Sequence, residues 1–159
     1  MKKSYKTGIS FGLVSGVLTT LGLLIGLGVG TQSKVAVVGG ILTIAIADAL
    51  SDAFGIHLSQ ESVGTNSDKY IWESTMATFL SKFLFAITFL IPVIFFNLDI
   101  AVKVSVIWGF ILIGYLSFLV SRSSGKEDIY KVVLEHISLF TMVIILSYAI
   151  GLVVNLFLN

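Results

Sequence analysis

The chain has 159 residues, of which 56% are hydrophobic and 12% are charged, and its mean hydropathy is +1.01. Soluble domains carry about 25% charged residues, so this chain has too little polar surface to coat a water-exposed particle, and we expect the lipid bilayer to be its solvent. The net charge of +1 offers no basic field for nucleic acid, and the absence of cysteine excludes disulfides, thiolate metal sites and cysteine nucleophiles.

The N-terminus starts with the basic patch MKKSYK, followed by an apolar run that continues to about residue 30. This run is longer than the apolar region of a signal peptide, and no small-residue cleavage site ends it, so we expect an uncleaved membrane span at about 8–30. Glycines recur in it every four residues, in two sets that each follow one helix face. Such faces let helix backbones approach closely in lipid. The glycines are Gly8, Gly12, Gly16, Gly22, Gly26 and Gly30.

These glycine faces have two interpretations that the sequence leaves open. They pack against other helices of the same chain, or they form the seam of a homodimer. We predict a homodimer through Gly8, Gly12, Gly16, Gly22 and Gly26.

Four further apolar segments are each long enough to cross the hydrocarbon core as a helix, which takes about 20 residues. They lie at about 34–58, 72–96, 100–120 and 129–157. Because the segments are continuous rather than alternating, they predict helices and not strands of a barrel. Pro92 removes a backbone donor and is expected to kink or end the third helix. The sequence thus predicts an all-α integral membrane protein with five transmembrane helices in a single domain, 1–159.

The distribution of positive charge predicts the orientation, because short cytoplasmic loops are enriched in lysine and arginine. Five spans place the termini on opposite sides. One side holds seven of the ten positive residues: Lys2, Lys3, Lys6, Lys69, Arg122, Lys126 and Lys131. The other side holds Lys34 and Lys103. We therefore predict a cytoplasmic N-terminus and a multi-pass protein of a prokaryotic plasma membrane.

Two carboxylates interrupt the second span, and one lysine interrupts the third. Asp48 and Asp52 are about one turn apart and share a helix face. Each ionisable group at this depth costs about 2.5–3.5 kcal/mol on insertion scales, so such groups usually line ion or proton pathways. Alternatively, Asp48 or Asp52 pairs with Lys82 simply to hold two helices together. The surplus acid favours a functional role, and we predict Asp48 and Asp52 as metal ligands with Lys82 as counter-ion or proton relay.

Four other ionisable residues are weaker candidates. His57 follows the acid pair on the same span and is predicted as a third metal ligand, although a histidine near a helix end is also a common interfacial residue. Glu135 and His136 lie in the second turn of the fifth span, and at most one of these neighbours faces a pathway. Glu61, in the polar linker after the second span, is a candidate for the first cytoplasmic contact of a cation.

Several stretches are similar to the vacuolar iron transporter family. GLVSGVLTTLGLLIGL (12–27) resembles the family's first helix, and GGILTIAIADALSDAFGIHLSQES (39–62) resembles its second, especially Ala-Leu-Ser at 49–51, Gly55 and the Ser-Gln end. SKFLFAITFLIPVIFF (81–96), with its single proline, is similar to the third helix. The last two spans and the basic loop SRSSGK (121–126) match the family in length and character. The resemblance covers nearly the whole chain.

The resemblance implies a dimeric, five-helix transporter that moves Fe²⁺ or Mn²⁺ out of the cytosol in exchange for protons, with the cation as substrate and no permanently bound cofactor. The chain departs from the family pattern at three positions. Phe11 replaces an aspartate, Asp52 replaces a methionine and Ile56 replaces a glutamate. The family's glutamate-rich cytoplasmic domain between the second and third helices is missing. A carboxylate at position 52 in place of a thioether would weaken a preference for softer ions.

No motif of a soluble enzyme is present in the sequence: it has no phosphate-binding Gly-Lys-Ser/Thr loop, no H-E-x-x-H pair and no G-x-S-x-G elbow. We therefore predict that the protein is not an enzyme. Its alternative to transport is a non-transporting membrane protein with a structural or partner-binding role, in which the acids and the lysine only join helices.

Overall fold

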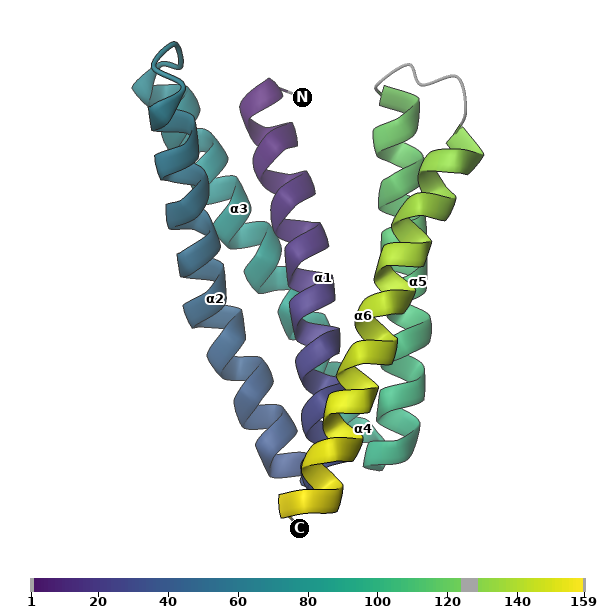
Figure 1. Ribbon diagram of the computed structural model, residues 1–159. Coiled ribbons are helices and arrows are strands. Elements are labelled where there is room, and N and C mark those ends of the chain that lie inside the picture. The colour runs from purple at the N-terminus through teal and green to yellow at the C-terminus, as the bar shows by residue number, and fades with distance from the viewer. Residues whose placement is uncertain (1, 124–128, 159) are drawn as a thin grey trace.

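A computed structural model of the chain describes residues 2–123 and 129–158, and the loop segment 124–128, which includes Lys126, lies outside the described residues. The described residues form helices joined by short turns (Figure 1). The helices are α1 (Lys3–Thr31), α2 (Lys34–Ser62), α3 (Asp68–Thr88), α4 (Leu90–Phe95), α5 (Leu98–Ser123) and α6 (Ile129–Leu158).

Five segments of this fold are long and apolar enough to cross a membrane, with α3 and α4 together forming one of them. They match the five predicted spans. The N- and C-termini lie at opposite ends of the bundle (Figure 1), as an odd number of spans requires. Many large apolar side chains point outward from the helices, including Phe54, Leu84 and Ile107. An apolar surface of this kind suits contact with lipid. Together with the five long apolar helices, it indicates a multi-pass integral membrane protein.

Helix α1 occupies the middle of the bundle and contacts α2, α3, α5 and α6. Figure 1 shows α2 and α3 on one side of α1 and α5 and α6 on the other, with the two pairs spread apart at the end that holds the N-terminus. The apolar core follows α1, where Val17, Leu21 and Leu24 are fully buried. Each helix pair is therefore anchored to the first span.

The third span is broken, as its proline predicts. Helix α3 ends at Thr88 and α4 begins at Leu90. Pro92 has no N–H to donate to the carbonyl four residues earlier, and its ring would collide with that carbonyl, which belongs to Thr88. The Phe89 N–H instead turns back to Ala86 O at 3.1 Å. The sequence did not predict a separate short helix, only the kink.

The helices extend further into the polar segments than the apolar patterns predict. Helix α1 begins at Lys3, and α2 runs to Ser62, so the linker before α3 is much shorter than expected. Gly64 allows this tight turn because its φ of 70° is left-handed. Ser67 then caps α3, where its hydroxyl accepts the Tyr70 N–H at 3.3 Å. Hydropathy marks the hydrocarbon-facing part of a helix, and these polar ends lie beyond it.

Both glycine faces of α1 are used inside the chain. A Cβ at Gly8 would collide with Ser74 O, and one at Gly12 would collide with Thr78 O, so this face packs on the backbone of α3. The second face meets α6, where a Cβ at Gly30 would lie 3.2 Å from Val154. The close approach along both faces is to helices of the same chain, which is the first of the two interpretations. The homodimer through these glycines stays a prediction.

Candidate functional site

The acid pair and the buried lysine meet in one cluster. Lys82 Nζ lies 2.6 Å from Asp48 Oδ2 and 2.5 Å from Asp52 Oδ2. A third oxygen, Ser15 Oγ, lies 2.9 Å from Nζ and donates its own proton to Asp52 Oδ2 at 2.5 Å. Three oxygens from α1 and α2 therefore surround the ammonium group of α3. The Asp48 contact is an ion pair without hydrogen-bond alignment, and among the described residues this oxygen has no hydrogen-bond partner.

The cluster lies near the middle of α2. Asp48 is 14 residues from Lys34 and 14 from Ser62, the two ends of α2, or about 21 Å along the axis in each direction. The Lys82 side chain is 1% exposed, whereas those of Asp48 and Asp52 are 31% and 22% exposed. The acids thus open to the outside of the chain, while the lysine is sealed behind them.

Small residues bring the three helices together at this point. Gly16 lies opposite Lys82, since a Cβ there would be 3.0 Å from Lys82 O. On α2, the alanines Ala45, Ala49 and Ala53 are buried at the spacing of one helix face. Ser15 is the residue before Gly16, so the same close approach brings its hydroxyl to Lys82.

The cluster holds more negative than positive charge. Two carboxylates and one ammonium group carry a formal charge of −1 when all are ionised. A pair placed only to join α2 to α3 would need one acid, and its burial would give little net stability. One carboxylate is therefore in excess of the lysine charge, and both acids are partly exposed.

His57 is not part of this cluster, although it was predicted as a third ligand. Its Nδ1 atom lies 3.1 Å from Thr75 Oγ1, and its ring meets the Trp72 ring edge-on at 4.8 Å. Because Thr75 already donates its proton to Ile71 O at 2.8 Å, Nδ1 of His57 is the donor in their bond. That nitrogen is therefore not available to a metal in this arrangement.

His57 instead lines a mainly apolar hollow of about 390 Å³ between α2 and α3. The other lining residues are Leu50, Ala53, Phe54, Trp72, Thr75, Met76 and Phe79. A second hollow of about 740 Å³ lies near the C-terminal ends of α1 and α6 and is lined in part by Asp99 and Lys103. Neither hollow includes a member of the Lys82 cluster. Among the described residues, no group of three or more histidine, aspartate or glutamate side chains could hold a metal ion.

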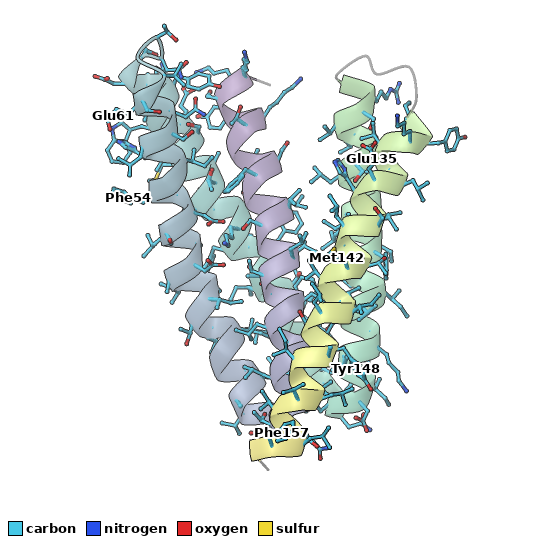
Figure 2. The ribbon with its side chains drawn as sticks, in the orientation of Figure 1. Phe54, Glu61, Glu135, Met142, Tyr148 and Phe157 are labelled. Carbon is cyan, nitrogen blue, oxygen red and sulfur yellow. The ribbon has the colours of Figure 1, made fainter. Side chains whose placement is uncertain are left out.

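Glu135 and His136 also lie apart from the cluster, on α6. His136 Nδ1 contacts Ser117 Oγ at 2.8 Å, and Ser117 donates to Ile113 O at 2.6 Å, so this histidine joins α6 to α5. Figure 2 shows Glu135 near the N-terminal end of α6 and Glu61 near the end of α2, on opposite sides of the bundle. Both side chains are exposed. They share one end of the molecule with the N-terminus and are not brought to one site.

A second ion pair fixes the N-terminal end of α1 to α3. Lys2 Nζ lies 2.8 Å from Glu73 Oε1, and Ser4 donates to the other oxygen of the same carboxylate at 2.6 Å. The hydrogen bond from Lys2 to Glu73, and then the attraction between their charges, raises the pKa of Lys2 above its usual value. This pair is exposed on the lysine side, so we assign it to holding the helix end and not to a pathway.

Comparisons of the chain with models of known protein families, with curated proteins and with solved structures gave no match. The family assignment therefore rests on the resemblance of the sequence stretches and is carried forward as a proposal. The residue that sequence reasoning missed is Ser15. Its signal is a polar side chain one position before Gly16, inside a glycine face that must approach another helix.

Proposed function

We propose that the protein is a membrane transporter that moves a divalent metal cation of the Fe²⁺ or Mn²⁺ class out of the cytosol in exchange for protons, with no permanently bound cofactor. Asp48 and Asp52 bind the cation. The observation that carries this proposal is the convergence of two partly exposed carboxylates, midway along an apolar helix, on one buried lysine. Carboxylate oxygens are ligands that hard divalent cations prefer.

Competition for the same oxygens supports an exchange mechanism. A divalent cation bound by Asp48 and Asp52 would neutralise both carboxylates and make the Lys82 ammonium surplus positive charge. The bound cation and the Lys82 ammonium group therefore repel each other. At a separation of 4 Å and an effective dielectric constant of about 20, the repulsion is roughly 4 kcal/mol for each unit of charge on the cation. A site that is occupied in turn by the Lys82 ammonium group and by a cation from solution has the property that an exchanger needs. Coupling to protons follows from the family resemblance.

The proposed orientation of the protein in the membrane follows from the distribution of positive charge in the sequence. The N-terminus, the C-terminal ends of α2 and α5 and the N-terminal ends of α3 and α6 belong to one end of the bundle (Figure 1). Positive charge is concentrated at this end in the sequence, so we propose that it is cytoplasmic. Outward flux then starts at this end and leaves near the α4 end of the molecule.

Metal flux into proteoliposomes tests the proposal, with a metal-sensitive dye and a pH-sensitive dye inside the vesicles. We expect wild-type protein to carry Mn²⁺ or Fe²⁺ with an opposite proton flux, and the double variant Asp48→Asn/Asp52→Asn to lose at least about 90% of the metal flux, since losing two charged ligands costs well over a tenfold change in affinity. Asp99→Asn removes an acid outside the cluster and is the matched control, with flux expected to be unchanged.

A further variant protects this test against misfolding. The double variant leaves the buried Lys82 without a counter-charge, so the triple variant Asp48→Asn/Asp52→Asn/Lys82→Met is assayed beside it. It keeps the cluster uncharged and is expected to fold and to carry no metal. Flux equal to that of wild type in either variant would remove the acids from any transport role. Absence of flux in folded wild-type protein for every divalent cation tried would favour the alternative, a structural or partner-binding membrane protein.

A further inference from the structure

The ammonium group of Lys82 already occupies a site made for a cation. Its Nζ atom lies 2.5–2.9 Å from three oxygens: it donates hydrogen bonds to Asp52 Oδ2 and Ser15 Oγ and forms an ion pair with Asp48 Oδ2. These oxygens come from two helices, and the lysine reaches them from a third. The side chain is 1% exposed, so water does not replace any of the three. The lysine is therefore a cation tethered inside the bundle.

Ser15 has two roles in this arrangement. Its proton goes to Asp52 Oδ2, which fixes the position of that carboxylate, and its lone pair accepts a proton of Lys82. A metal ion that takes the place of the ammonium group would meet the same lone pair. Oxygen donors alone suit hard cations such as Mn²⁺, and neither a sulfur nor a nitrogen ligand is among the groups that contact Nζ.

We propose that Ser15 is the third oxygen ligand and the positioning residue for Asp52 in this cation site, and that Lys82 is a built-in competitor which a divalent cation must displace. This inference rests on the proposed function for the identity of the cation, but it concerns equilibrium binding and not flux. It explains why a serine stands at the glycine face of α1: Gly12 and Gly16 bring that helix close enough to α3 for the hydroxyl to reach Nζ.

Thermal unfolding of purified full-length protein in detergent, titrated with MnCl₂ at constant ionic strength, tests the proposal. A ligand that prefers the folded state raises the melting temperature in a concentration-dependent way, so the titration gives the half-saturating Mn²⁺ concentration. We expect Ser15→Ala to raise that concentration about 10- to 100-fold, the usual effect of losing a group that orients a metal ligand. Ser15→Thr keeps a hydroxyl and is expected to stay close to wild type.

Thr19→Val is the matched control for a purely structural effect. Thr19 lies one turn further along α1, and its hydroxyl donates only to Ser15 O of its own helix at 2.9 Å. It is expected to change the melting temperature slightly and the half-saturating Mn²⁺ concentration not at all. An equal Mn²⁺ response in Ser15→Ala, Thr19→Val and wild type would overturn the role of Ser15, whatever their melting temperatures without metal.

Lys82→Met tests the tethered competitor. Methionine has a similar length and no charge, so the three oxygens remain while the repelling ammonium group is gone. We expect half-saturation at a Mn²⁺ concentration lower by about tenfold or more. If this variant is unfolded without metal, Mn²⁺ is expected to restore its folded state. The competitor role of Lys82 would be overturned if Mn²⁺ bound a folded Lys82→Met variant no more tightly than wild type. It would also be overturned if Mn²⁺ failed to restore the fold of an unfolded one.

The two proposals fail separately. Wild-type flux together with an unchanged Mn²⁺ response in Ser15→Ala and Lys82→Met would leave transport in place and remove this inference. A weakened Mn²⁺ response in Ser15→Ala without any flux in wild type would leave a cation site that does not transport.

Discussion

Replacing Lys82 by methionine is expected to lower the free energy of unfolding by about 3 kcal/mol in metal-free buffer. Removing one member of a buried ion pair costs about 3–5 kcal/mol, because the partner charge remains behind. The lower end of that range applies here since Asp48 and Asp52 are 31% and 22% exposed and retain some solvation. Unfolding by SDS in mixed micelles, followed by tryptophan fluorescence, measures the difference.

A second substitution distinguishes charge from packing in this result. Asp52→Asn in the Lys82→Met background removes one of the two repelling carboxylates and is expected to recover at least about 1 kcal/mol, whereas loss of a packing contact would not be recovered. Lys103→Met, an exposed lysine on α5, serves as the control and is expected to change stability by less than about 0.5 kcal/mol. Equal stability of Lys82→Met and wild type would mean that the ion pairs of the cluster contribute nothing to the fold.

Substituting Gly12 by alanine is expected to destabilise the bundle by about 1–3 kcal/mol or more, the cost of overpacking a filled interface. The added Cβ would collide with Thr78 O, which is main chain and cannot rotate away, and with Ser81 Oγ. Helix α1 would have to move off α3, which also separates Ser15 from Lys82. The SDS unfolding assay reports the loss of stability, and the Mn²⁺ titration reports the accompanying loss of affinity.

Gly55 provides the matched control, because a Cβ there would meet nothing within 4 Å. Gly55→Ala is expected to be neutral or to stabilise α2 by up to about 1 kcal/mol, since alanine favours a helix over glycine. If Gly12→Ala were as stable as Gly55→Ala, α1 and α3 would not be in backbone contact, and the cluster would lose the packing that assembles it.

The number of spans could be predicted from the sequence because bilayer-facing helices have a strong compositional signal. The break after Thr88 was also predictable as a kink, since Pro92 acts on a carbonyl four residues earlier. The exact helix ends were not, because α1 from Lys3 and α2 to Ser62 continue through polar residues that hydropathy treats as loop. The turn at Gly64 depends on backbone conformation, which composition does not reveal.

The site was predictable only in part. Intramembrane charge identified Asp48, Asp52 and Lys82, and the spacing of the acids placed them on one helix face, but spacing within α2 could not decide between pairing and a pathway. Sequence separation of 67 residues hides the contact of Ser15 with Lys82. His57 was predicted as a third metal ligand, and that role stays a prediction; five residues of helix beyond Asp52 turn its side chain toward Thr75 and Trp72 and away from the acids.

The central claim is that the acid pair faces a hydrated route and is not merely neutralised between helices. The chain contains no cysteine, so a single cysteine can be introduced without first removing native ones. Asp52→Cys, Ile46→Cys and Thr65→Cys test the cluster, an exposed apolar position on α2 and the turn before α3. The measurement is the rate at which a charged, membrane-impermeant methanethiosulfonate modifies each thiol in proteoliposomes. Reaction needs the thiolate, which forms in water and not in hydrocarbon.

We expect Ile46→Cys to stay unmodified. We expect Asp52→Cys to react at a rate closer to that of Thr65→Cys than to that of Ile46→Cys. A cysteine at position 52 that is as unreactive as the one at position 46 would contradict the claim and would leave the Lys82 cluster as a joint between helices.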